Sequence, residues 1–205
     1  MSDERETKPA GHRWFAATYD FLVRGAERRR IGKLRRNLLA NVRGDVLEIG
    51  AGTGANFEHY PSDARVIATE PDPHMLKRAQ GKLRPNIDAR LAPAEELPFA
   101  DASFDTVVST LVLCTVRDPA RALNEARRVL RPGGSLIFLE HVRGEGALAR
   151  FQKLIQPVYG WFAAGCHLSR DTERAITDAG FRFETITRGK LAPLMPAIYG
   201  VGRPA

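Results

Sequence analysis

The clearest indication of the fold is the stretch Val-Leu-Glu-Ile-Gly-Ala-Gly-Thr-Gly-Ala-Asn, residues 46–56. It begins as a short apolar segment typical of a buried strand, and three glycines then alternate with small residues. Glycine lets the backbone turn tightly and lets a ligand approach main-chain atoms with no Cβ in the way. After the first strand of a doubly wound sheet, such a turn faces the crevice where ligands bind. We therefore expect ligand contacts from Gly50, Gly52, Gly54 and Asn56.

Two acidic residues accompany this loop. Glu70 lies 20 residues after Gly50, at the end of the next apolar segment, where an acid can bind the two hydroxyls of a ribose. Glu48 precedes the first glycine by two residues and offers a second polar group. The run also fits Gly-x-Gly-x-x-Ala, so a nicotinamide or flavin enzyme is an alternative. The absence of a Tyr-x-x-x-Lys pair and the little room for a second catalytic domain argue against it.

From residue 44 onward, strand and helix signals alternate. Short apolar or β-branched segments predict further strands at 65–69, 87–91, 104–110, 135–140, 181–187 and 198–203. Amphipathic spacing and turn residues predict helices at 53–60, 73–84, 118–130 and 171–179. This order predicts an α/β, Rossmann-like fold: a mostly parallel sheet of about seven strands with helices on both faces.

Positive charge is concentrated at the amino end. The chain has 31 Lys+Arg against 24 Asp+Glu, a net charge of +7, and residues 1–44 contribute +6 of it (11 minus 5). Apolar residues recur there at helical spacing, so we expect 1–44 to form a basic amphipathic helical cap on a domain at 45–205. Such a helix either packs on the domain with a solvated basic face or makes peripheral contact with an anionic membrane.

Composition excludes several classes of protein. Hydrophobic residues make up 43% and charged residues 27% of the chain, which is ordinary for one globular domain. No stretch approaches the roughly 20 apolar residues of a membrane-spanning helix, and the first residues do not resemble a signal peptide. Two cysteines do not make a disulfide framework, so we expect a cytoplasmic protein. No His or Cys spacing suggests zinc, so no metal is expected, and no nucleic-acid partner.

Taken together, the motifs resemble those of the class I S-adenosylmethionine-dependent methyltransferases. Residues 48–54 look like that family's first motif, and Glu70-Pro71-Asp72 looks like its ribose-binding acid and neighbours. Residues 94–105 are similar to the stretch from the adenine pocket into the fourth strand, and 129–134 to the turn before the fifth. The resemblance implies S-adenosylmethionine as the methyl donor, with S-adenosylhomocysteine as its product.

The same resemblance implies further contacts with the methyl donor. They are expected from Tyr19, Glu48, Pro71, Ala94, Glu95, Thr110 and Leu111. Tyr19 resembles an N-terminal tyrosine that closes over the donor in relatives; the alternative is plain helix packing. Pro93 stands where many relatives have an Asp that accepts a hydrogen bond from the adenine amino group, so the Ala94 main chain or Glu95 would make that contact.

Other segments resemble the alkyl-thiol S-methyltransferases of the methyltransferase-like group. These segments are 52–57, 110–114, 139–142, 165–170 and 192–194. The resemblance implies transfer to a small apolar acceptor, with a thiol as the first choice. Those enzymes have a hydrophobic N-terminal membrane anchor, whereas this chain has the basic stretch. The pattern also resembles phospholipid N-methyltransferases and quinone C-methyltransferases, and a non-catalytic S-adenosylmethionine-binding protein is a further alternative.

Methyl transfer from a sulfonium needs alignment of the reacting atoms and a deprotonated nucleophile, without a metal or a covalent intermediate. His141 follows the fifth predicted strand at the ligand-binding edge, so it is a candidate base; alternatively it bonds a loop backbone. Relatives insert a substrate cap at about 145–170. Candidate acceptor contacts in this segment, which could equally be ordinary core, are Tyr159, Trp161, Phe162 and Cys166.

Overall fold

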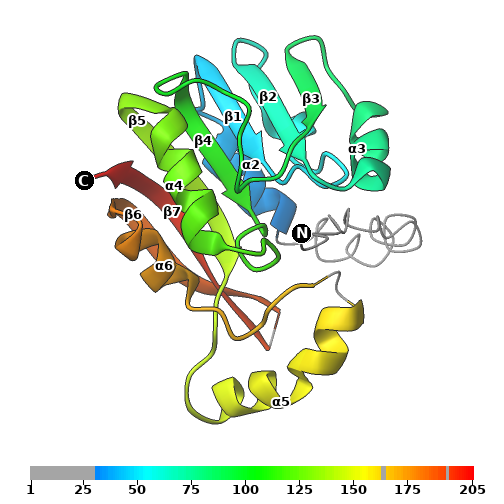
Figure 1. Ribbon diagram of the computed structural model, residues 1–205, viewed down its shortest axis with the longest axis vertical. Coiled ribbons are helices and arrows are strands. Elements are labelled where there is room, and N and C mark those ends of the chain that lie inside the picture. Colours follow the sequence, from blue (N-terminus) through cyan, green and yellow to red (C-terminus); the bar gives the residue numbers. More distant parts are fainter. Residues whose placement is uncertain (1–30, 163–164, 193) are drawn as a thin grey trace, which may run out of the picture.

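The computed structural model describes residues 31–162, 165–192 and 194–205 (Figure 1). These residues form one seven-stranded sheet with the strand order β3-β2-β1-β4-β5-β7-β6. The strands are β1 (Asp45–Ile49), β2 (Arg65–Glu70), β3 (Ile87–Leu91), β4 (Phe104–Thr110), β5 (Leu130–His141), β6 (Phe181–Ala192) and β7 (Met195–Pro204). The first five run parallel, and β7 pairs antiparallel with both β5 and β6. The predicted mostly parallel α/β sheet is confirmed.

Helices cover both faces of this sheet, as the alternating pattern predicts. They are α2 (Gly32–Leu39), α3 (Pro73–Gln80), α4 (Pro119–Val129) and α6 (Thr172–Asp178). A further helix, α5 (Gly146–Phe162), lies elsewhere. Side chains of α4 and α6 pack with Leu136 and Phe138 of β5 in one apolar core. Side chains of α2 and α3 join Ile137 of the same strand in the core of the other face. Alternate residues of β5 therefore point into different cores, as strand geometry requires.

Three helices begin at an aspartate whose side chain caps them. The Asp72 side chain accepts hydrogen bonds from His74 N and Met75 N. In the same way, Asp118 accepts one from Arg121 N, and Asp171 accepts one from Arg174 N. Proline follows Asp72 and Asp118 at the first helical position, where a missing N–H costs nothing. The predicted Asp118-Pro119 helix start is confirmed.

Element boundaries differ from the prediction in places. The helix expected at 53–60 is only a 3-10 turn, η2 (Phe57–His59), because Gly54 adopts a positive φ of 79° that no α-helix accommodates. The helix expected to reach residue 84 ends at Gln80 before Gly81. Strands β6 and β7 are longer than expected because they pair with each other along almost their whole length.

Helix α5 lies apart from the helices that cover the sheet. Figure 1 shows it at the end of the molecule toward which β1–β4 point, near the tip of the β6–β7 hairpin. The buried amide of Gln152 attaches it to the body, since its Oε1 accepts from Gly144 N at 2.7 Å and its Nε2 donates to Leu194 O at 3.1 Å. The location agrees with a cap insertion at 145–170, and its role stays a prediction.

Helix α2 is the part of the predicted N-terminal cap that the structure describes. Ile31 packs against Leu139, Leu191 and Ala197, and Leu39 is fully buried in the core beside β1. This segment therefore packs on the domain. Tyr19 lies outside the described residues, and the boundary predicted at residue 45 stays a prediction. Among the helices of the described residues, none combines the length and apolarity needed to cross a membrane.

Candidate active site

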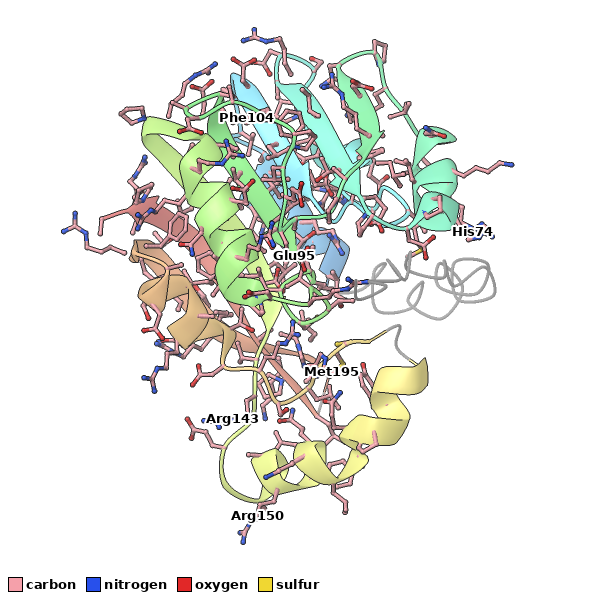
Figure 2. The ribbon with its side chains drawn as sticks, viewed as in Figure 1. His74, Glu95, Phe104, Arg143, Arg150 and Met195 are labelled. Atoms are coloured by element: carbon pink, nitrogen blue, oxygen red, sulfur yellow. The ribbon has the colours of Figure 1, made fainter. Side chains whose placement is uncertain are left out.

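The strand order reverses between β1 and β4, so the loops after these strands form the crevice of the sheet. Figure 2 shows Glu95 at the opposite end of the sheet from Phe104, the first residue of β4. The predicted ligand residues around the glycine loop and after β2, β3 and β4 therefore lie at the carboxyl edge. The prediction of a site at this edge was inferred from a mostly parallel α/β sheet, and the structure has that sheet.

The glycine loop is shaped by backbone that other residues rarely adopt. Gly50, Gly52 and Gly54 have φ values of 61°, 58° and 79°. A Cβ on Gly50 would lie 2.7 Å from Val112 of the loop after β4, whereas one on Gly52 would meet only Met75 Cε, at 3.9 Å. Gly50 is therefore required by packing within the chain, and Gly52 borders open space where a ligand can approach main-chain atoms.

Glu70 ends β2 directly beside this open space. Its Oε2 accepts a hydrogen bond from Gly52 N at 2.8 Å, and its Oε1 accepts from Asp72 N at 2.9 Å. The side chain is 7% exposed. Burial raises the pKa of Glu70, while the two amide hydrogen bonds act in the opposite direction. Each carboxylate oxygen can accept a second hydrogen bond, so the residue is able to bind paired hydroxyls. Pro71 beside it is exposed.

Glu48, Asn56 and Thr110 lie beneath the loop in one buried network. The Glu48 carboxylate accepts from Asn56 Nδ2 and from Tyr60 Oη, both at 2.9 Å. Asn56 Nδ2 also donates to Thr110 Oγ1 at 3.0 Å. Burial raises the pKa of Glu48 to about 7, against the hydrogen bond from Tyr60 and the charge of Arg35. These side chains contact one another, so they support the loop from below.

Arg35 of α2 is a member of this network that sequence reasoning missed. It is 4% exposed, and its Nη1 donates to Asn56 Oδ1 at 2.8 Å and to Thr110 Oγ1 at 2.6 Å. We expected the arginines of this segment on a solvated face. A signal was present, since Arg35 falls four residues after Ile31 and four before Leu39, on the apolar stripe of the helix.

The turn after β4 is held by a third buried acid, which sequence reasoning did not predict. Glu140 of β5 accepts from Ser109 Oγ at 2.7 Å, from Val112 N at 3.1 Å and from Leu113 N at 3.2 Å. Burial raises its pKa to about 7. Leu111, in this turn, has a φ of 60°, which is uncommon for a residue with a branched side chain. Such local strain gathers at functional sites, where the surrounding structure enforces it.

The residues after β3 border the same edge. Ala94 is buried, and Glu95 Oε1 accepts from Arg117 N at 2.7 Å. Glu95 therefore joins the segment after β3 to the start of α4. Its partly exposed carboxylate lies at the carboxyl edge (Figure 2), and the predicted adenine contact at Ala94 or Glu95 stays a prediction.

Three residues from separate elements meet near this edge of the sheet. They are Cys114 after β4, His141 at the end of β5 and Cys166 after α5, and their sulfur and ring-nitrogen atoms lie within 4.8 Å of one another. His141 is fully buried, and neither ring nitrogen has a hydrogen-bond partner within the described part of the chain. The sequence prediction of no metal site considered only the spacing of His and Cys residues along the chain. It could not detect residues that are distant in the sequence and meet in the fold.

The remaining predicted acceptor contacts lie on α5. Tyr159 is half-buried there, and the side chains of Trp161 and Phe162 lie outside the described residues. Gln156 joins α5 to the segment after it, donating to Cys166 O at 3.0 Å and accepting from Leu168 N at 2.7 Å. Contact with Cys114 lowers the pKa of the Cys166 thiol, and the same contact and burial raise that of Cys114.

Comparison with known proteins assigns this arrangement to a family. Residues 47–138 match the family model described as a methyltransferase domain. The human thiol S-methyltransferase TMT1B is 36% identical over 193 residues, covering 84% of this chain and 79% of that protein. This chain belongs to the S-adenosylmethionine-dependent methyltransferases.

Two further similarities support the assignment of this methyltransferase. The phosphatidylethanolamine N-methyltransferase of Cereibacter sphaeroides is 33% identical over 171 residues, covering 78% of this chain and 81% of that protein. A structure from Thermotoga maritima, described as a possible histamine N-methyltransferase, superposes with a TM-score of 0.69 at 25% identity. That superposition covers 93% of this chain and 95% of the other, and the described residues have the Rossmann-like class I fold.

The methyl donor is S-adenosylmethionine, and the residues of this methyltransferase fit it. The space beside Gly52 is one that a Cβ would fill, and Glu70 at its rim has acceptor capacity for ribose hydroxyls. The acceptor is a small molecule. The residues assigned here to donor and acceptor stay predictions from geometry and resemblance.

Proposed function

We propose that this methyltransferase transfers a methyl group to the thiol sulfur of a small apolar molecule. The observation that carries the proposal is the 36% identity with human thiol S-methyltransferase TMT1B over 84% of this chain. That match is much longer than residues 47–138, the stretch common to methyltransferase domains in general. It therefore includes chain outside the shared donor-binding part, where enzymes of one fold differ in the acceptor they take.

Apolar side chains at the carboxyl edge support an apolar acceptor. Leu111 and Met195 pack against a buried cluster that contains Leu139 and Leu191. A thiol with a short hydrocarbon chain gains free energy by leaving water for such surroundings, at about 0.8 kcal/mol for each buried CH₂ group. A strongly charged acceptor would instead require paired charges there.

The reaction is an in-line displacement. When bound, S-adenosylmethionine supplies an electrophilic methyl group and its own leaving group. The acceptor sulfur forms a bond to the methyl carbon as the bond from that carbon to the sulfonium sulfur breaks, and the thiol proton leaves for solvent or a base. The chain's part is to hold the two sulfurs in line around the methyl carbon, which makes a large contribution to the rate. We assign this task to the glycine loop and the Leu111 turn, and the positive φ values of both segments support that assignment.

A phospholipid amine is the second candidate acceptor. It is favoured by the 33% identity with the phosphatidylethanolamine N-methyltransferase of Cereibacter sphaeroides over 78% of this chain. The excess of positive charge in residues 1–44 supports contact with an anionic membrane surface. In that case the protein would bind vesicles of anionic lipid in a manner that high salt abolishes.

The two candidates separate in one assay. S-Adenosylhomocysteine release by the purified full-length protein is measured with a short alkanethiol and, separately, with phosphatidylethanolamine vesicles. We expect turnover with the thiol that saturates with its concentration and disappears in the Gly52→Val variant. Turnover with vesicles alone would replace the thiol proposal with the phospholipid one. Binding of S-adenosylhomocysteine without turnover on either acceptor would contradict both.

A further inference from the structure

The cluster of Cys114, His141 and Cys166 carries chemistry that the donor site does not use. One potential ligand atom from each residue lies within 4.8 Å of the other two. In a tetrahedral zinc site, Zn–S bonds of about 2.3 Å and Zn–N bonds of about 2.0 Å place the ligand atoms about 3.5–3.8 Å apart. The three side chains therefore need only small rotations to converge on one ion.

The imidazole of His141 gives independent evidence for a missing partner. The residue is 0% exposed, and both of its ring nitrogens lack a hydrogen bond within the described residues. A buried polar atom without a partner costs about 1–3 kcal/mol, so native structures rarely leave one. A metal ion bound to one ring nitrogen would give that nitrogen a partner and would account for the position of the buried ring.

The carbonyl oxygen of each of the three proposed ligand residues accepts a hydrogen bond from another segment. His167 N donates to Cys114 O at 2.8 Å, which fixes the segment after α5 against the turn after β4 (Figure 1). Thr172 Oγ1 donates to His141 O at 3.2 Å. Gln156 Nε2 donates to Cys166 O at 3.0 Å. Each ligand's main chain thus has a partner from another element, as preformed metal sites require.

We propose that Cys114, His141 and Cys166 bind one zinc ion and leave its fourth position open to the sulfur of the acceptor thiol. The proposal rests on the thiol reading of the function given above. Two thiolates and one imidazole are ligands that suit zinc, and three protein ligands with an open position are the pattern of catalytic rather than structural zinc sites. Two thiolates also neutralise the charge of the ion, which lies among buried side chains.

The place of the cluster agrees with this role. Cys114 lies two residues after Val112, whose side chain packs against Gly50 of the glycine loop, so the ion would lie on the acceptor side of the donor crevice. An open cavity of about 410 Å³ is lined by Gly165 and His167, the two neighbours of Cys166. This cavity borders the segment that carries Cys166.

The ion changes how the acceptor loses its proton. A free thiol has a pKa of about 8.5 and is mostly protonated at neutral pH, whereas a thiol bound to zinc is deprotonated outright. The proton leaves for solvent when the acceptor sulfur binds the ion, and the sulfur then forms its bond to the methyl carbon as described above. In this arrangement His141 is a metal ligand, which replaces its expected role as a base.

Metal content of the full-length protein tests the site directly. Protein expressed in zinc-supplemented medium and purified under reducing conditions is analysed by mass spectrometry for all metals. We expect about one zinc per chain, and a fall of at least about tenfold in the Cys166→Ser and His141→Gln variants, because each loses a ligand. The His167→Gln variant is the matched control, since this exposed histidine adjoins Cys166 without joining the cluster. It should keep its zinc.

Replacement of zinc by cobalt(II) reports the ligands without any assay of activity. We expect thiolate-to-cobalt charge-transfer absorption that is weaker in Cys166→Ser and that shifts when a short alkanethiol is added. Binding of S-adenosylhomocysteine by each variant shows that it has folded. A protein that holds no zinc after incubation with the metal under reducing conditions, or that binds it equally well in folded Cys166→Ser, would overturn the proposal. Copper in place of zinc would do the same.

The outcomes keep this proposal distinct from the proposed function. Zinc bound through the three residues, but no turnover on thiols, would overturn the thiol function and the open fourth position while leaving the metal site. Thiol turnover by protein free of zinc would overturn the metal site while leaving the function. A loss of two mass units in non-reducing conditions, preventable by reductant and insensitive to zinc, would show a Cys114–Cys166 disulfide in place of the metal.

Discussion

Gly52 is the residue on which we expect access to the donor site to depend most directly. Its φ of 58° and the open space at its Cβ position mean that a side chain there would project into the ligand's space. We expect Gly52→Val to abolish S-adenosylhomocysteine binding in isothermal titration calorimetry while the protein still folds. Gly133→Val is the matched control, because Gly133 has a comparable φ of 79° and nothing within 4 Å of its Cβ position, away from the site. Equal donor affinity in the two variants would disprove the assignment.

A second prediction at the scale of one side chain concerns Glu70. Its carboxylate holds Gly52 N and has acceptor capacity left for the ribose hydroxyls. We expect Glu70→Ala to weaken S-adenosylhomocysteine binding by about 1–3 kcal/mol, or about 5- to 150-fold, the cost of losing a charged hydrogen-bond partner. Calorimetry on Asp88→Ala, which removes an exposed acid from the neighbouring β3, should show unchanged affinity. Unchanged affinity in Glu70→Ala would remove the residue from the donor site.

At the scale of elements, Arg35 joins α2 to the loop after β1 and to the end of β4. Its guanidinium donates to Asn56 and Thr110 and lies in the field of the buried Glu48 carboxylate. Removing one member of a buried polar network leaves the others without partners. We expect Arg35→Met to lower the free energy of unfolding by about 3 kcal/mol in chemical denaturation. Arg36→Met, next to it on the exposed face of α2, should change stability little, and similar losses in both variants would refute the buried role.

The attachment of α5 gives a second element-scale prediction. Gln156 makes two hydrogen bonds to the backbone on either side of His167, so it positions the segment that carries Cys166. We expect Gln156→Leu to raise the KM for the acceptor about fivefold, the equivalent of about 1 kcal/mol, with donor affinity unchanged. Leu154→Ala is the control, since that side chain on the same helix is 77% exposed. A change in donor affinity with an unchanged KM for the acceptor would contradict this prediction and would indicate that α5 acts on the donor.

At the scale of the whole molecule, buried Glu48 makes stability depend on pH. Its pKa is raised from 4.5 to about 7 in the folded protein, so the folded state binds more protons than the unfolded state between these values. The contribution of Glu48 to stability is therefore fully present below pH 4.5 and is lost as the pH rises to about 7, by on the order of 3 kcal/mol for 2.5 units. Unfolding by urea across this range should show a shallower fall in Glu48→Gln, which stays neutral throughout. An identical fall would assign the effect to other groups.

Much of the architecture could be predicted because its signals are local. Period-2 and period-3.6 apolar patterns identify elements one at a time, and the glycine loop, Glu70 and the Asp-Pro helix starts each report on a few consecutive residues. Because parallel strands are joined by right-handed crossovers, only a few arrangements of these strands and helices are possible. The carboxyl edge with Gly52 and Glu70 followed from this reasoning. The lengths of β6 and β7 could not be predicted in this way, because they depend on pairing between strands.

Local sequence signals were enough to predict the class of fold and to propose a donor site at the glycine loop, on the carboxyl edge of the sheet. Tertiary structure alone decided which polar side chains meet there. Arg35 reaches Thr110 across 75 residues of chain, and Cys114, His141 and Cys166 converge from three elements. The physical reason is that periodicity shows which side of its own element a residue occupies, whereas the strand order and the packing of α2 and α5 determine what that side faces.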